Sequence, residues 1–143
     1  MKIKNGTLIN MINVLNTCGK KKLPQKISYA ITKNIINLSG NYECYSKSIQ
    51  KIVSDYGDYI LKDDDGKQMV NNVGLPMVDD SHMADYISEI NELLGIEIDV
   101  NLYTIDDSVF DYDDSKYDVL TAQEILQLQT ILCKSDGEEW LYA

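Results

Sequence analysis

The sequence predicts an α+β fold dominated by helices: one long heptad-patterned helix, shorter helices and a small antiparallel sheet. Three observations predict this class. Apolar residues recur at steps of 3 and 4 over residues 24–56, shorter segments carry helical spacing or helix caps, and residues 96–102 alternate apolar with polar. With 143 residues and 44% apolar content, the chain is long enough for one core. We expect a single domain over 1–143, with a basic helical half (1–56), an acidic half (57–133) and a tail (134–143).

The first elements are predicted from short local signals. Lys2–Asn5 is typical of a short strand, and Asn5-Gly6 of a turn. Thr7 can cap a helix over 8–18, whose apolar side chains follow the 3-4 spacing, and Gly19 can end it. A basic loop then leads to a proline suited to the first turn of the next helix.

The segment after Pro24 predicts a helix of about thirty residues with one continuous apolar stripe. A helix this long needs packing partners along its length, supplied either by the C-terminal helices or by a second copy of the chain. We expect a homo-oligomer through residues 24–56. The residues of this apolar stripe are Ile27, Ile31, Ile35, Leu38, Tyr42, Tyr45, Ile49, Ile52 and Tyr56.

The acidic half opens with a predicted β-hairpin. Residues 59–62 and 67–70 flank Asp63-Asp64-Asp65-Gly66, and Asp-Gly is a preferred hairpin turn. Residues 71–80 are expected to form a loop, and no internal repeat is evident.

The remaining elements are a helix, a strand and a final helix. Asp80 or Ser81 can cap a helix to Leu94, and the alternation over 96–102 predicts a half-buried strand. An acidic connection covers 106–118. Thr121-Ala122-Gln123-Glu124 is a capping box that opens a last helix to about Cys133.

Charge is distributed unevenly along the chain. Residues 1–55 hold nine lysines and two acids, whereas residues 56–143 hold four lysines and 21 acids, and there is no arginine. The asymmetry fits solubility and attraction between the halves; alternatively, the basic face attracts a phosphate-bearing ligand and the acidic face a basic protein. A net charge of −10 disfavours general nucleic-acid binding.

No apolar run reaches membrane-spanning length and no signal peptide is visible, so we expect a soluble, unexported protein with no membrane contact.

The sequence carries no catalytic or metal signature, so we expect a non-enzymatic protein without a cofactor. The three cysteines are widely spaced, and His82 has no catalytic partner at a recognisable spacing. The aspartates of 106–118 lack the glycine and the closing glutamate of an EF-hand loop, so no metal site is expected.

The best candidate site lies at the start of the long helix. Lysines there offer positive charge, the first helical amides favour an anion, and a tyrosine ring can stack on a base. This combination predicts binding of a nucleotide-like anion; the alternative is a solvated basic loop. The candidate ligand-binding residues are Lys20, Lys21, Lys22, Lys26, Tyr29 and Lys33.

The chain resembles a family of short bacteriophage proteins that share a domain of unknown function. The matching segments are Met1-Lys2-Ile3-Lys4-Asn5-Gly6, Leu23-Pro24 with Ile27-Ser28-Tyr29 and Lys33-Asn34, Asp65-Gly66 with the loop 74–79, Glu89–Leu94 running into Ile96–Val100, and Leu120-Thr121. The family supplies no activity, so no functional residue is transferred from it.

The resemblance implies action in the bacterial host cytoplasm during infection. Small acidic phage proteins without an enzymatic role are typically inhibitors of host defence or parts of virion assembly. We expect a protein that counters host anti-phage defence by sequestering an anionic nucleotide-type immune signal. The alternatives are an acidic inhibitor of a host defence nuclease, and a virion assembly chaperone or minor structural protein.

Overall fold

The computed structural model of the protein describes residues 1–133, so the predicted tail lies outside the described residues. Within them, the helix-dominated α+β class is confirmed. None of the helices described is both long and apolar enough to cross a membrane. The helices are α1 (Asn5–Gly19), α2 (Gln25–Asp55), α3 (Asp80–Leu94) and α4 (Ala122–Leu132); the strands are β1 (Lys2–Lys4) and β2 (Glu97–Asp99); and the 3-10 turns are η1 (Gly57–Tyr59) and η2 (Asp107–Phe110).

The chain divides into two compact units. Unit 1 combines Met1–Tyr42 with residues 97–133, and unit 2 is Glu43–Ile96. Helix α2 contributes residues 25–42 to unit 1 and residues 43–55 to unit 2. The units therefore follow the packing of the chain and do not coincide with its basic and acidic halves.

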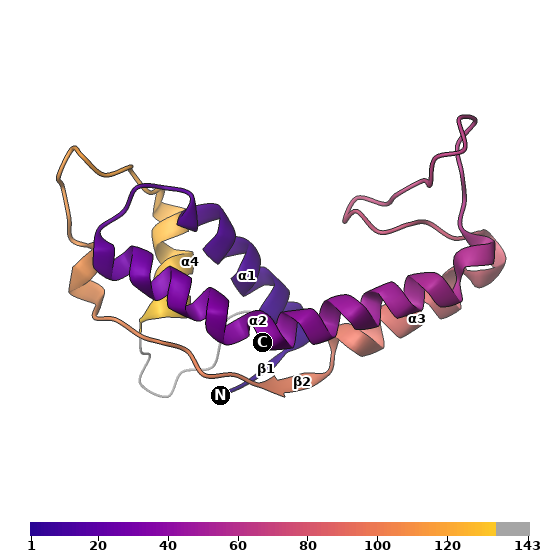
Figure 1. The fold of residues 1–143 in the computed structure, drawn as a ribbon, viewed down its shortest axis with the longest axis horizontal. Helices are drawn as coiled ribbons and strands as arrows, with labels where there is room; N and C mark the ends of the chain where they lie inside the picture. The colour runs from indigo at the N-terminus through magenta and orange to yellow at the C-terminus, as the bar shows by residue number, and fades with distance from the viewer. Residues whose placement is uncertain (134–143) are drawn as a thin grey trace. The chain divides into compact units, whose positions relative to one another are not determined.

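Unit 1 has a core built from α1, the first part of α2 and α4 (Figure 1). Strands β1 and β2 pair antiparallel beside it, with Ile3 opposite Ile98. Ile3 is buried, and the residues on either side of it are exposed. The fully buried core residues include Leu8 and Leu15 of α1, Ile27 and Leu38 of α2, and Leu128 and Leu132 of α4.

Opposite charges meet within unit 1. Residues 1–42 carry seven lysines and no acid, and residues 97–133 carry nine acids and one lysine. The register of the small sheet places Lys2 opposite Asp99 and Lys4 opposite Glu97, and oppositely charged cross-strand pairs are favourable. Much of the charge asymmetry is therefore complementary inside one unit, as the first of the two interpretations expected.

Unit 2 is a helical pair with its own core. Helix α3 runs beside residues 43–55 of α2 (Figure 1), and Ile49 packs in one buried cluster with Ile90 and Leu93. The rings of Tyr56 and Tyr86 meet edge to face with centroids 5.1 Å apart. The Tyr56 hydroxyl also hydrogen-bonds Glu89, which raises the pKa of Tyr56 to about 12.

The apolar stripe of α2 is largely covered inside the chain. Ile27, Ile31 and Leu38 are buried in the core of unit 1, and Ile49 is buried in that of unit 2. An uncovered stripe was the reason to expect a second copy, and that reason is removed. Homo-oligomerisation through residues 24–56 stays a prediction without structural support.

The predicted hairpin forms two segments of a three-segment ring in unit 2. The amide of Leu61 donates to the carbonyl of Met77 (2.9 Å), Met69 donates to Leu61 (2.9 Å), and Met77 donates to Met69 (2.8 Å). Each segment therefore pairs with both of the others. The predicted hairpin pairing is present, with Lys62 opposite Gln68 in an antiparallel bridge. The expectation of a plain loop over 71–80 is wrong, because the chain after residue 71 returns as a third segment.

The ring carries an eight-residue repeat, which corrects the expectation that no repeat is present. In both turns, a side-chain Oδ1 accepts two amides: Asp63 accepts from Asp65 and Lys67, and Asn71 accepts from Val73 and Leu75, all at 2.9–3.0 Å. In both turns a glycine follows three residues after the acceptor. Gly66 and Gly74 have φ of +79° and +83°, in the left-handed region that glycine adopts readily.

The third copy of the repeat opens α3. Asp79 occupies the position equivalent to Asp63 and Asn71, and its Oδ1 accepts the His82 amide at 3.1 Å as the N-cap. His82 stands where the turns have glycine, and the chain continues as a helix. The N-cap is thus Asp79 and neither Asp80 nor Ser81.

Other boundaries also differ from expectation. Helix α1 begins at Asn5, so Asn5-Gly6 is helical and Thr7 is a buried residue within the helix. Strand β2 is shorter than the predicted 96–102, and its three residues pair with the three residues of β1. The capping box of Thr121 and Glu124 at the start of α4 is confirmed.

Replacing Asn71 tests the repeat. Asn71→Ala removes two side-chain acceptor bonds, and we expect it to lower the free energy of unfolding by about 1–2 kcal/mol. Asn72→Ala, at the exposed neighbouring position, is the matched control and should have almost no effect. Urea denaturation measures both, and an equal loss in the two variants would contradict the role of Asn71.

Candidate functional site

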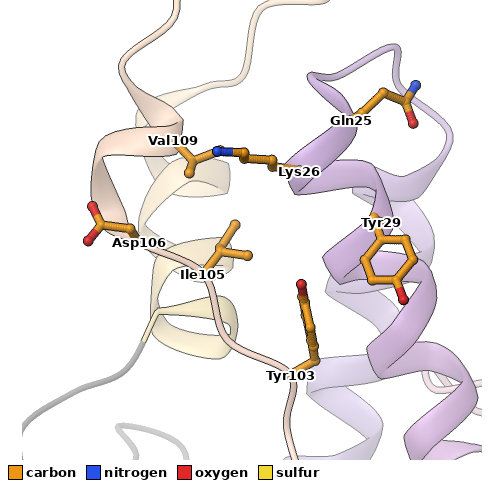
Figure 2. A pocket seen from close by; sticks show the side chains of 7 residues that line it. All are labelled: Gln25, Lys26, Tyr29, Tyr103, Ile105, Asp106 and Val109. Carbon is orange, nitrogen blue, oxygen red and sulfur yellow. The ribbon is translucent and has the colours of Figure 1, made fainter.

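A pocket of about 410 Å³ lies in unit 1 at the start of α2 (Figure 2). Lys26 and Tyr29 of α2 form one side of it. Tyr103, Ile105 and Val109, from the segment between β2 and α4, form the other. Tyr29 and Tyr103 are 56% and 39% exposed, so both rings present surface that a ligand can contact.

Asn34 holds the two sides of the pocket together. Its side chain is fully buried, and its Nδ2 donates to the carbonyls of Ala30 (2.9 Å) and Tyr103 (2.8 Å). Its Oδ1 accepts the Tyr103 amide at 2.7 Å. The two hydrogen bonds between the Asn34 side chain and the Tyr103 backbone fix that backbone against α2. The Tyr103 ring then lies edge to face with Tyr29, with centroids 5.4 Å apart.

One positive and one negative side chain line the pocket. Figure 2 shows Lys26 extending from α2 toward the side formed by Val109, and the Asp106 carboxylate turned away from the two tyrosines. Asp106 Oδ1 accepts from the Ser108 hydroxyl (2.7 Å) and amide (2.9 Å). These bonds lower the pKa of Asp106, so the carboxylate caps η2 in its ionised form.

Two of the six predicted site residues, Lys26 and Tyr29, line this pocket, and the other four do not. Lys21 is half-buried with its Nζ 3.7 Å from Glu124 Oε2. The backbone of Lys22 forms two hydrogen bonds with Asp118: its amide donates to the side-chain Oδ2 (2.7 Å), and its carbonyl accepts the Asp118 amide (2.8 Å). Lys20 follows α1, and Lys33 is exposed on α2.

The helix start offers fewer amides than expected. Ile27 and Ser28 both donate their amides to the Pro24 carbonyl at 3.0 Å. An anion at this end of α2 is therefore limited to the amides that precede Ile27, and charge from Lys26 becomes the larger attraction.

The pocket residues missed from the sequence belong to the later segment. Tyr103, Ile105, Asp106 and Val109 lie about eighty positions beyond Lys26 and Tyr29, and no local pattern fixes which of them faces α2. Asn34 could have been found from the sequence. It is a polar residue next to the apolar stripe of a helix, and a buried polar side chain there needs hydrogen-bond partners.

His82 has a carboxylate partner that the sequence reasoning did not find. Its Nδ1 lies 2.6 Å from Asp79 Oδ1, and its ring stacks on Tyr59 with centroids 3.5 Å apart. The same Asp79 caps α3, so the pair belongs to the helix start in unit 2. Across residues 1–133, no group of three or more histidine, cysteine or acidic side chains could hold a metal ion.

The chain matches no family model, no curated protein and no solved structure. The resemblance to short phage proteins therefore stays a prediction, and the function is argued from the site alone.

Replacing Asn34 tests the construction of the pocket. Asn34→Ala removes three hydrogen bonds and leaves the Tyr103 backbone without its partner, so we expect a loss of about 2–4 kcal/mol in the free energy of unfolding. Asn37→Ala, one turn along α2 and exposed, is the control. A loss below 1 kcal/mol for Asn34→Ala, or an equal loss in the control, would contradict the role of Asn34 in holding Tyr103 against α2.

The pairing of Glu124 predicts a pH dependence. The Thr121 amide lowers the pKa of Glu124 from its ordinary 4.5, and Lys21 adds to the effect. Because the folded-state pKa is the lower one, the ionised form stabilises the fold above pH 4.5, and this contribution is lost as pH falls through the folded value. Glu124→Gln should lower the melting temperature at pH 7 and bring it closer to wild type in acid, with Gln123→Ala as the control at both pH values.

Proposed function

We propose that this protein is a non-enzymatic bacteriophage protein that counters host anti-phage defence by sequestering an anionic nucleotide-type immune signal in the host cytoplasm. The observation that carries the proposal is the pocket at the start of α2. It combines a lysine, two exposed tyrosine rings and apolar walls. A planar base can contact the rings while a phosphate meets the ammonium group. The phage setting rests on the sequence resemblance.

The pocket favours a compact ligand of low charge. Its volume of about 410 Å³ is toward the lower end of the roughly 300–1,000 Å³ typical of ligand pockets. The lining of the pocket contains one lysine and one carboxylate, so a ligand with several phosphates would find too little positive charge there. A nucleotide with one or two phosphates is therefore the best fit.

A second candidate is an acidic inhibitor that binds a basic protein, such as a host defence nuclease. Unit 2 supports it, because its residues 43–96 hold eleven acids against four lysines. Electrostatic complementarity would speed association with a basic surface. A role as a virion assembly chaperone or minor structural protein remains the other alternative, with no specific contact to favour it.

Calorimetry with AMP, ADP-ribose and cyclic di- and trinucleotides tests the proposal. Loss of a charge-assisted contact in Lys26→Ala should weaken binding by about tenfold or more, and Tyr29→Ala should weaken it as well. Lys33→Ala removes a lysine of the same helix outside the pocket and should bind as the wild type does.

Two outcomes would contradict the proposal. If the folded protein binds none of these nucleotides, the protein-binding candidate is favoured. That candidate is tested by the salt dependence of association with a basic nuclease. Equal weakening by Lys26→Ala and Lys33→Ala would mean diffuse electrostatic attraction without a defined site.

A further inference from the structure

A second cavity in unit 1 has aromatic walls. It measures about 510 Å³ and lies in the connection between η2 and α4. Tyr112 and Tyr117 line it, with ring centroids 5.6 Å apart and planes at 79°. Phe110 and the largely buried Leu120 add apolar surface. This cavity shares no lining residue with the pocket at the start of α2.

The charged groups lining this cavity are all carboxylates. Asp113, Asp114 and Asp118 line it, and no lysine does. Asp118 is braced by the Lys22 amide, and Asp114 Oδ1 accepts the Lys116 amide at 3.0 Å. Within the described part of the chain, Asp113 forms no hydrogen bond or ion pair. Its charge is therefore free to meet a ligand.

One alkylammonium group of the chain already binds at the edge of this cavity. Lys116 Nζ lies 5.0 Å from the centroid of the Tyr117 ring and 3.7 Å from Asp114 Oδ2. The Tyr117 ring and the Asp114 carboxylate together therefore accommodate a primary ammonium. Aromatic faces attract cations electrostatically, and apolar walls suit the methylene groups that separate the charges of an aliphatic amine.

We propose that this aromatic, carboxylate-lined cavity binds a small aliphatic polyamine. Several carboxylates around one cavity match several ammonium groups, and the tyrosine rings distinguish an organic cation from a metal ion. A hydrated divalent cation gains little from aromatic walls, and hard cations prefer a shell of oxygen ligands. The volume is within the range of small-molecule pockets. The proposal is independent of the nucleotide site.

Calorimetry with spermidine, and separately with calcium chloride, tests the proposal on the full chain at low ionic strength. We expect saturable spermidine binding that shifts the NMR ring signals of Tyr112 and Tyr117, and no comparable binding of calcium. Absence of spermidine binding would overturn the proposal, as would calcium binding of equal strength that competes with spermidine.

Matched variants locate the site. Tyr117→Ala should weaken spermidine binding by about fivefold or more, whereas Tyr117→Phe keeps the ring and should restore it. Asp113→Asn should weaken binding by about threefold, and Asp111→Asn, an acid of the same segment outside the lining, should not. Lys116→Gln removes a competing positive charge and should tighten binding. Equal effects of Asp113→Asn and Asp111→Asn, or unchanged binding in Tyr117→Ala, would overturn the proposal.

Discussion

Unit 1 depends on the pairing of two segments that are far apart in the sequence and opposite in charge. Residues 1–42 and 97–133 share one apolar core; opposite charges occupy facing positions across the small sheet, and Lys21 pairs with Glu124. The buried apolar surface supplies most of the stability, because exposed ion pairs contribute little each. The charges instead favour this pairing over others, since like-charged segments would repel.

This pairing changes the meaning of the basic N-terminal region. A cluster of lysines in an acidic protein indicates an anion-binding surface when it is considered alone. In the fold, Lys2 and Lys4 lie opposite acids, Lys21 contacts Glu124, and the backbone of Lys22 is bonded to Asp118. Of the candidate lysines, Lys26 lines the pocket at the start of α2 and the other four do not, so the case for a ligand rests on local geometry and not on the sum of charges.

Local patterns in the sequence were sufficient to predict the helices and the capping box. The long helix follows from apolar spacing, and Thr121 with Glu124 from one motif. The ring of unit 2 was missed because its copies share the acceptor at Asp63, Asn71 and Asp79 while most other positions vary, and His82 replaces the glycine of the turns. Tyr103 was missed because its position depends on a tertiary bond to Asn34.

The two cavities described above each have one wall of irregular backbone, and each such wall is braced by a residue of the region 22–34. Asn34 fixes Tyr103 for the first cavity, and the Lys22 backbone fixes Asp118 for the second. Irregular segments have few backbone bonds of their own, so such braces determine where their side chains lie. At Lys22 this support comes from the backbone alone, since its side chain lines neither cavity while its amide and carbonyl both bond to Asp118.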